Sequence, residues 1–377
     1  AGAGDRRIER HGLEVVDAYV AAIGRVVRPR REPAVVHAVH TSLHGVGAQT
    51  LRRAVASLGF VELHEVPEQQ EPDPDFPTVA FPNPEEPGAI DALLREAAFR
   101  GADVAFAHDP DADRLAMAIS DPRARRPRDV ETWRVLTGDE LGCLLADHLV
   151  RRGGLPEGAT MATTIVSSTL LRHIAAEAGA EYVETLTGFK WIVRAAPEGR
   201  LVLGYEEALG YSVGDAVADK DGISAMLLAC EMISTLVGSG LTVTDRLDDL
   251  ARRHGVHVTG QWSARLEGSD GVQRIADAMA RLRAAPPERI GDRQVARVSD
   301  LADGAPTRGL PPADVVGLVL PGARVVVRPS GTEPKLKCYV EVVEPVVEGS
   351  DVASARARAE AERDGLLAAL PADLDLD

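Results

Sequence analysis

The stretch "AVVHAVHTSLHGVGAQTLRRAVASLGFVELHEV", from Ala34 to Val66, decides the fold of this chain. Its β-branched apolar start predicts a strand over residues 34–40. The helical spacing of apolar residues over 48–59 predicts a helix, and "FVELHEV" predicts a second strand over 60–66. A strand, a helix and a strand in succession are typical of parallel strands covered by a helix.

The alternation continues along the chain. A helix is expected over 89–101 and a strand over 102–109, and a second alternation of the same kind runs to about residue 254. Beyond that point the strands are grouped apart from the helices, which favours an α+β arrangement. The sequence therefore predicts the fold class α/β, with two consecutive α/β domains of mixed or parallel sheet and a smaller α+β C-terminal domain, over residues 1–125, 126–254 and 255–377.

The composition is that of a globular protein with an acidic balance. The formal net charge is −16, and such a negative field makes nucleic acid and anionic membrane surfaces poor partners. No uninterrupted apolar run in the sequence reaches the roughly 18 residues of a membrane span. The three cysteines lie far apart without C-x-x-C spacing, so we expect neither a zinc site nor a disulfide framework, and we expect a reducing cytoplasm.

Lysine is rare in this chain. Of the 42 basic residues only four are lysines, and they lie in the segments "TGFK", "ADKDG" and "EPKLK", at Lys190, Lys220, Lys335 and Lys337. An ammonium group is a compact point charge, whereas a guanidinium group is a planar fork. The retained lysines therefore indicate places where a compact cation is needed.

The segment "FAHDPDADRLAMAI", residues 106–119, gathers three aspartates between two apolar runs. Asp109 would lie at the carboxyl end of a strand, where open α/β sheets bind ligands, and Asp111 and Asp113 would share its turn. Two unit charges about 4 Å apart repel by about 4 kcal/mol at an effective dielectric of roughly 20, so a cation is expected among them. Hard oxygen ligands favour Mg²⁺ or Ca²⁺. Arg114 beside the turn indicates a phosphate bound to the same ion.

Three alternative roles compete for the aspartates. An EF-hand loop that begins at Asp109 needs glycine at its sixth position and glutamate at its twelfth; Arg114 and Ser120 stand there instead, which excludes it. A phosphatase that forms an aspartyl phosphate on Asp109 stays open on the sequence alone. So does a plain solvated acidic turn.

The segment "RPSGTEPKLK" lies between two expected strands and offers the parts of a phosphate cradle. These parts are an arginine fork, two hydroxyls, a small residue whose amide can approach a ligand, and an ammonium group, at Arg328, Ser330, Thr332, Gly331 and Lys337. An ordinary β-turn built on Ser-Gly is the alternative.

Two more loops follow expected strands and carry polar side chains. In "LTGFKW", Gly188 permits close backbone approach and Lys190 can meet a phosphate or a sugar oxygen. In "GYEEALGY", Glu206 and Glu207 can accept hydrogen bonds from vicinal hydroxyls. A helix start with a solvated lysine and an acidic helix N-terminus are the alternatives for these two loops.

The set "HDPDADR", "TGFKW", "GYEEALGY" followed by "DKDG", and "RPSGTEPKLK", in this order and spacing, resembles the α-D-phosphohexomutase superfamily, which includes phosphoglucomutases and phosphomannomutases. "HTSLHGVG" and the proline-rich segment that starts "EQQEPDPDFP" also resemble the second domain of a bacterial phosphoglucomutase and phosphopentomutase-like branch. The resemblance covers nearly the whole chain, as family domains 2, 3 and 4.

The resemblance implies an activity and a set of roles. The activity is a phosphosugar mutase that interconverts hexose 1-phosphate and hexose 6-phosphate through a phosphoserine and a sugar bisphosphate intermediate. The aspartate trio would hold Mg²⁺, Arg114 would lie near the transferring phosphoryl group, and Lys190, with Gly188 beside it, would contact the phosphosugar as a candidate proton donor. Glu206 would bind sugar hydroxyls, and the loop from Arg328 to Thr332 would grip the phosphate that does not react.

The sequence departs from the family pattern in two ways. Ala208 stands where family members often have serine, which removes one hydroxyl contact and leaves the hexose preference open. No segment resembles the phosphoserine loop Thr-Ala-Ser-His-Asn-Pro, so we expect the family's first domain to be missing from this sequence. A Mg²⁺-dependent aspartyl-phosphate phosphatase and a non-catalytic phosphosugar-binding fragment are the alternative functions.

Overall fold

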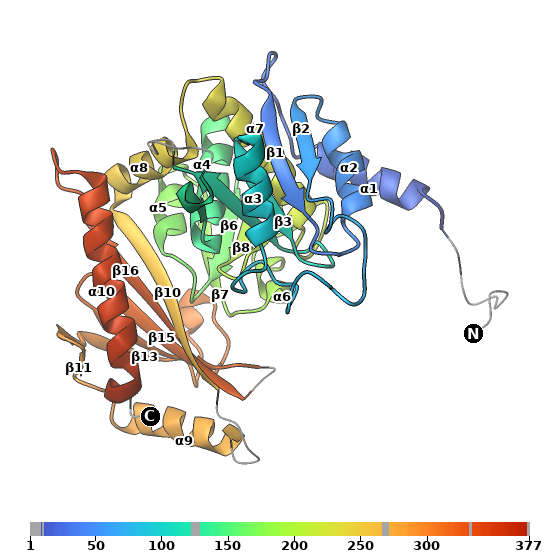
Figure 1. The fold of residues 1–377 in the computed structure, drawn as a ribbon. Coiled ribbons are helices and arrows are strands. Elements are labelled where there is room, and N and C mark those ends of the chain that lie inside the picture. The colour runs from blue at the N-terminus through green and yellow to red at the C-terminus, as the bar shows by residue number, and fades with distance from the viewer. Residues whose placement is uncertain (1–8, 10, 122–128, 266–270, 332–333, 375–377) are drawn as a thin grey trace. The chain divides into compact units, whose positions relative to one another are not determined.

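The structure is a computed structural model that describes residues 9, 11–121, 129–265, 271–331 and 334–374. The chain divides into two compact units, which Figure 1 draws as ribbons. Unit 1 is made of residues Ala1–Glu157 and Ala196–Thr244, and unit 2 of Gly158–Ala195 and Asp245–Asp377. The three domain boundaries expected from the sequence stay a prediction.

Unit 1 is built on a mixed five-stranded sheet in the order β2-β1-β3-β4-β5. Its strands are β1 (Val36–Thr41), β2 (Val61–Glu65), β3 (Val104–His108), β4 (Leu115–Ser120) and β5 (Trp133–Val135). β1 runs parallel to β2 and β3, as the strand–helix–strand pattern predicts. β4 runs antiparallel to β3, because the short turn between them leaves no room for a crossover helix. β5 pairs antiparallel with β4.

Unit 1 also contains helices and a second strand pair. They are α1 (Glu14–Gly24), α2 (Ala48–Ala56), α3 (Asp91–Arg100), the 3₁₀ helix η1 (Val130–Thr132), α4 (Gly138–Arg152), β8 (Leu201–Glu206), β9 (Gly210–Val213) and α7 (Gly222–Val237). α3 contacts β1 and β3, and α7 contacts β1 and β4. β8 and β9 form an antiparallel hairpin, whose strands contact α4 and α7 respectively.

Two helices of unit 1 begin at capping residues that the sequence supplies. The run "TGDE" forms a capping box before α4, in which Thr137 Oγ1 accepts from the Glu140 N–H and Glu140 Oε2 accepts from the Thr137 N–H, each at 3.1 Å. The Asp221 side chain caps α7 by accepting from the Ile223 N–H at 3.2 Å. These caps fix where the loops that precede α4 and α7 end.

Unit 2 combines a parallel strand pair with an antiparallel sheet. The pair is β6 (Thr160–Thr164) and β7 (Glu181–Thr185), with α5 (Leu170–Glu177) and the short α6 (Phe189–Ile192). The sheet has the order β10-β16-β15-β14-β13, with β10 (Val256–Arg265), β13 (Arg297–Asp300), β14 (Val316–Leu320), β15 (Ala323–Pro329) and β16 (Lys335–Glu344). The remaining elements are most of α8 (Val243–His254), α9 (Gly271–Ala284), the hairpin β11 (Arg289–Ile290) and β12 (Arg293–Gln294), the 3₁₀ helix η2 (Pro306–Arg308) and α10 (Val352–Asp373).

Alternation along the strands of unit 2 decides which face of the antiparallel sheet forms the core. Leu318, Val325 and Val340 are at most 1% exposed and belong to one apolar cluster with residues of α9 and α10. The helices α9 and α10 contact β14 and β16 respectively, and α10 also contacts β10. The α+β arrangement expected for the C-terminal part is confirmed.

No helix in the described part of the chain has both the length and the hydropathy of a membrane span.

Helix α4 lies so close to β8 that one glycine has no space for a side chain. A Cβ at Gly142 would lie 2.5 Å from the ring of Tyr205, which is fully buried. Alanine in place of a mid-helix glycine normally stabilises a helix by about 1 kcal/mol. We expect Gly142→Ala instead to destabilise by about 1–3 kcal/mol, because a rigid ring must move. The midpoint of urea unfolding measures this.

Gly365 in α10 is the matched control. It is exposed, and a Cβ built on it meets nothing within 4 Å. Gly365→Ala should therefore raise stability by up to about 1 kcal/mol. A Gly142→Ala variant that gains stability like Gly365→Ala would contradict the close packing of α4 on β8.

Candidate functional site

The turn between β3 and β4 in unit 1 brings the three expected aspartates together. Oxygen atoms of the Asp109, Asp111 and Asp113 carboxylates lie within 4.8 Å of one another. The Arg114 N–H donates to Asp109 Oδ1, and the Ala112 N–H donates to the Asp109 carbonyl, both at 3.0 Å. Local hydrogen bonds thus hold the turn in a form that points three like charges at one place.

Burial and the neighbouring carboxylates change the pKa of Asp109 in this turn. Asp109 is 9% exposed, and the other two aspartates are more open to water. Burial, opposed by the hydrogen bond from the Arg114 N–H and assisted by the charges of Asp113 and Asp111, raises the pKa of Asp109 to about 6. A cation among the carboxylates would reverse this effect.

Two cationic side chains of unit 1 reach the turn. Arg114 Nε lies 3.5 Å from Asp109 Oδ2 and 3.9 Å from Asp113 Oδ1. Lys220, in the loop before α7, places Nζ 2.8 Å from Asp113 Oδ2. Lys220 is a site residue that the sequence prediction missed, although the rarity of lysine had marked its segment.

Two buried histidines stand behind the turn without adding positive charge. A ring nitrogen of His40 lies 2.8 Å from one of His108, and both side chains are about 1% exposed. Burial lowers the pKa of His108 to about 4 and that of His40 well below its ordinary value. Both rings are therefore neutral near pH 7 and add no positive charge to that of Arg114 and Lys220.

The acidic turn of the β8–β9 hairpin lies beside the aspartate turn. Arg114 and Gly210 form an antiparallel bridge, and the Leu115 N–H donates to the Leu209 carbonyl at 3.0 Å. Glu206 ends β8. Burial lowers the pKa of Lys220, but its hydrogen bond to Asp113 and the charges of nearby carboxylates, that of Glu206 among them, raise it overall. Glu206 and Glu207 thus lie in a loop adjacent to the aspartate turn, within the same unit.

The expected lysine loop lies in unit 2, at the start of α6. Gly188 precedes this helix with φ of 114°, a backbone conformation that favours glycine. Lys190 is exposed, with Nζ 5.6 Å from the centroid of the Trp191 ring. The lysine is therefore accessible to a ligand.

The expected phosphate cradle is the β15–β16 hairpin of unit 2. Arg328 and Lys337 are cross-strand neighbours, and the Ser330 N–H donates to the Lys335 carbonyl at 2.7 Å. Gly331 is exposed at the tip, and Thr332 lies outside the described residues. Like charges that face each other across a sheet are unfavourable, so this hairpin favours a bound anion.

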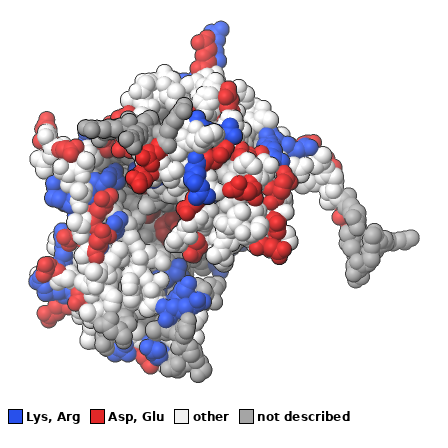
Figure 2. Space-filling view, viewed as in Figure 1, with Lys and Arg blue, Asp and Glu red and all other residues white. Residues whose placement is uncertain are grey.

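The loops of unit 1 and those of unit 2 carry charges of opposite sign, in a chain whose net charge is −16. Unit 1 offers carboxylates with a lysine and an arginine beside them, and unit 2 offers an arginine and lysines. On the face drawn in Figure 2, acidic and basic side chains are interspersed with uncharged surface. Local clusters, not the overall field, therefore determine what each loop can bind.

Three family models match the chain. They describe the phosphoglucomutase/phosphomannomutase alpha/beta/alpha domain II over residues 17–122, alpha/beta/alpha domain III over 137–256 and the C-terminal domain over 275–365.

Curated relatives extend the similarity. The chain is 39% identical over 331 residues to a probable phosphomannomutase of Haemophilus influenzae, across 87% of this chain and 64% of the relative. It is 36% identical over 325 residues to a probable phosphoribomutase of Schizosaccharomyces pombe, across 80% and 54%. It is 34% identical over 333 residues to the human phosphopentomutase, across 81% and 53%. The chain thus spans between about half and two thirds of the length of these relatives.

A solved structure shares the fold. A phosphoglucomutase/phosphomannomutase family protein from Burkholderia thailandensis superposes with a TM-score of 0.65 at 20% identity, over 95% of this chain and 64% of that one.

The aspartate turn predicts a pH-dependent response to Mg²⁺. Because the pKa of Asp109 is raised to about 6, above the value of about 3.9 for a free aspartate, the metal-free protein loses stability from this group as the pH rises through 6. Mg²⁺ needs the ionised carboxylate. We therefore expect Mg²⁺ to raise Tm at pH 7.5 and to have a much smaller effect at pH 5, as measured by thermal unfolding with and without the ion.

Two variants sharpen this measurement. Asp109→Asn should remove most of the effect of Mg²⁺ at pH 7.5. Asp277→Asn, at an exposed position of α9, should leave the effect unchanged. An equal shift of Tm at both pH values, or none at pH 7.5, would show that the turn does not bind the ion through Asp109.

Proposed function

This chain belongs to the phosphoglucomutase/phosphomannomutase family, and from that premise we propose that it forms the metal-binding and substrate-binding part of a Mg²⁺-dependent phosphosugar mutase. The substrates would be a hexose 1-phosphate and a hexose 6-phosphate. The observation that carries the proposal is the convergence of three carboxylates beside Lys220, in the same unit as the Glu206 hairpin.

The donor set of the aspartate turn fits Mg²⁺. Carboxylate oxygens are hard ligands, and the ion is commonly held by one or two carboxylates together with substrate phosphates. Asp109, Asp111 and Asp113 would hold it. A bound Mg²⁺ supplies positive charge that offsets the negative charge on a transferring phosphoryl group.

The side chains of this chain would bind and orient the substrate. Arg114 would donate to phosphoryl oxygens near the aspartate turn, and Glu206 and Glu207 would accept hydrogen bonds from sugar hydroxyls. Arg328, with Lys337 opposite it, would grip the phosphate that does not react.

A proton must also move, because the attacking sugar hydroxyl loses one when it takes up a phosphoryl group. Lys190, next to Gly188, is the candidate to exchange that proton with the sugar oxygen. A phosphoserine would give its phosphoryl group to the free hydroxyl of the sugar monophosphate, which forms a sugar bisphosphate. The other phosphate of that bisphosphate would then pass to the serine. No segment of this sequence resembles that serine loop, so ligand binding is the direct readout for this chain.

A pentose phosphate is a second candidate substrate. Ala208 stands in the acidic hairpin where a hydroxyl would help to bind a hexose. Two of the relatives are named a phosphoribomutase and a phosphopentomutase. Titration with ribose 5-phosphate beside glucose 1-phosphate distinguishes the two sugars.

Loss of Arg328 should weaken phosphosugar binding. A hydrogen bond to a charged group contributes about 1.5–3 kcal/mol, so Arg328→Ala should weaken glucose 1-phosphate binding about 10- to 100-fold in the presence of Mg²⁺. Isothermal titration calorimetry on the full chain measures this. Arg274→Ala, at an exposed position of α9, is the control and should bind like the wild type. Equal affinities for the two variants would remove the β15–β16 hairpin from the proposal.

The phosphatase alternative has its own signature. If Asp109 were a nucleophile, the chain would release inorganic phosphate from glucose 1-phosphate with Mg²⁺, and Asp109→Asn would stop the release. We expect no release from the wild type. Release that depends on Asp109 would replace the mutase proposal with a phosphatase.

A further inference from the structure

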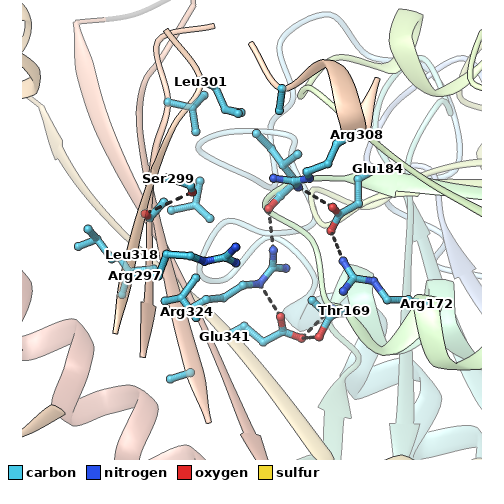
Figure 3. Close-up of a pocket in the computed structure, with 18 of the residues that line it drawn as sticks. Thr169, Arg172, Glu184, Arg297, Ser299, Leu301, Arg308, Leu318, Arg324 and Glu341 are labelled. Atoms are coloured by element: carbon cyan, nitrogen blue, oxygen red, sulfur yellow. Dashed lines mark hydrogen bonds and ion pairs between the residues drawn. The ribbon is translucent and has the colours of Figure 1, made fainter. Parts of the chain in front are cut away.

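Unit 2 contains a large hollow that none of the proposed phosphosugar loops lines. Its volume is about 930 Å³, at the upper end of the roughly 300–1,000 Å³ of small-molecule sites. Segments around β7, α5 and η2 form one wall, and strands β13 to β16 form the other (Figure 3). We call this space the sheet hollow.

The strand register explains why one wall of the sheet hollow is polar. Residues that alternate with the core positions form a row across four strands, because Arg297 pairs with Val319, Val319 with Arg324, and Arg324 with Glu341. Their neighbours along the strands point to the apolar core under α9 and α10. The row therefore points the other way, toward the sheet hollow.

A glycine on this wall leaves space in the sheet hollow. Gly317 pairs with Ser299 and with Val326 in the next row of the sheet. A Cβ at Gly317 would lie 2.6 Å from Ser299 Oγ, on the face that lines the sheet hollow. Glycine weakens a strand interior and often marks a place where a ligand approaches closely.

Three of the arginines around the sheet hollow already hold carboxylates. Glu184 accepts from Arg172 at 3.1 Å and from Arg308 at 2.6 Å, so one carboxylate is shared by two guanidinium groups. Glu341 accepts from Arg324 at 2.7 Å. The side chains of Glu184 and Glu341 are only 8% and 3% exposed. Arg324 also donates to the carbonyl of Ile165 at 3.0 Å and to that of Ser167, so its guanidinium is fully engaged.

Arg297 is the fourth arginine and differs from the others. Within the described residues it forms no ion pair, and Figure 3 shows its side chain on the same wall as Arg324, directed toward the Arg324 guanidinium. The third carboxylate of the lining, Asp300, is already paired at 3.0 Å with Arg283, which does not line the sheet hollow. The lining is therefore net positive in an acidic chain, and such a concave wall attracts anions.

We propose that the sheet hollow binds a small organic phosphate as an effector, at a site separate from the phosphosugar loops. A phosphate dianion matches the planar donor fork of Arg297, and the positive charges of Arg172 and Arg308 also line the space. The organic part would lie on the apolar lining, which includes Ile165, Leu301 and Val326. Arg328 lies four residues beyond Arg324 in β15, which is about 13 Å along the strand, and does not line this space.

Nucleotides and phosphosugars both present this chemistry, and the experiment separates them. Calorimetry on the full chain carrying Arg328→Ala removes the contribution of the β15–β16 hairpin, and AMP and glucose 6-phosphate are titrated in turn. We expect at least one of the two to bind. The tighter of the two identifies the source of the phosphate.

Variants in the same Arg328→Ala background locate the binding. Arg297→Glu should weaken the affinity at least tenfold, because it reverses a charge that pairs with no described residue. Gly317→Val should abolish binding by filling that space. Arg274→Glu makes the same charge change on α9, outside the sheet hollow, and should have no effect.

The outcomes decide the proposal in either direction. Circular dichroism first shows that each variant is folded; if Gly317→Val is not, Arg297→Glu decides alone. Binding that weakens in Arg297→Glu and persists in Arg274→Glu supports the site. No binding of either phosphate to a folded chain, or equal binding in the two charge variants, overturns it. Neither result depends on the mutase activity, so the proposed function is tested separately.

Discussion

The repulsion among three carboxylates is the constraint on which the site of unit 1 depends. Each pair of unit charges about 4 Å apart costs about 4 kcal/mol at an effective dielectric of roughly 20, and burial removes water that would screen Asp109. Two cationic side chains, Arg114 and Lys220, contact these carboxylates, whereas the histidines behind the turn stay neutral. The convergence of three carboxylates therefore favours the binding of a cation from solution at the centre of the cluster.

In unit 2 the side chains that cluster are positively charged. Its β15–β16 hairpin places Arg328 opposite Lys337, and the sheet hollow places Arg297 and Arg324 in one cross-strand row. Both arrangements follow from strand register, since alternate residues of β15 and β16 turn to the face that the helices leave uncovered. Glu341 shows how such a face stays stable. It is 3% exposed and accepts from Arg324, His257 and the hydroxyl of Ser168, so its charge is fully engaged.

Local patterns in the sequence were sufficient for the α/β class, the α+β C-terminal part and the family, because each depends on short-range periodicity or on a contiguous motif. They were not sufficient for contacts made by distant residues. Lys220 meets Asp113 across 107 positions, and the rarity of lysine marked its segment without naming a partner. The sheet hollow joins Arg172, Arg297 and Arg308, which come from separate elements and share no motif. Only the register of the strands and the packing of unit 2 bring them together.

The division of the chain into discontinuous units determines how the two units can be isolated. The polypeptide passes from one unit to the other three times, after Glu157, Ala195 and Thr244. A single protease nick or a single stop codon therefore cannot separate one unit from the other, because each unit contains two segments that alternate along the chain. Isolation of either unit requires that its two segments be excised and joined to each other.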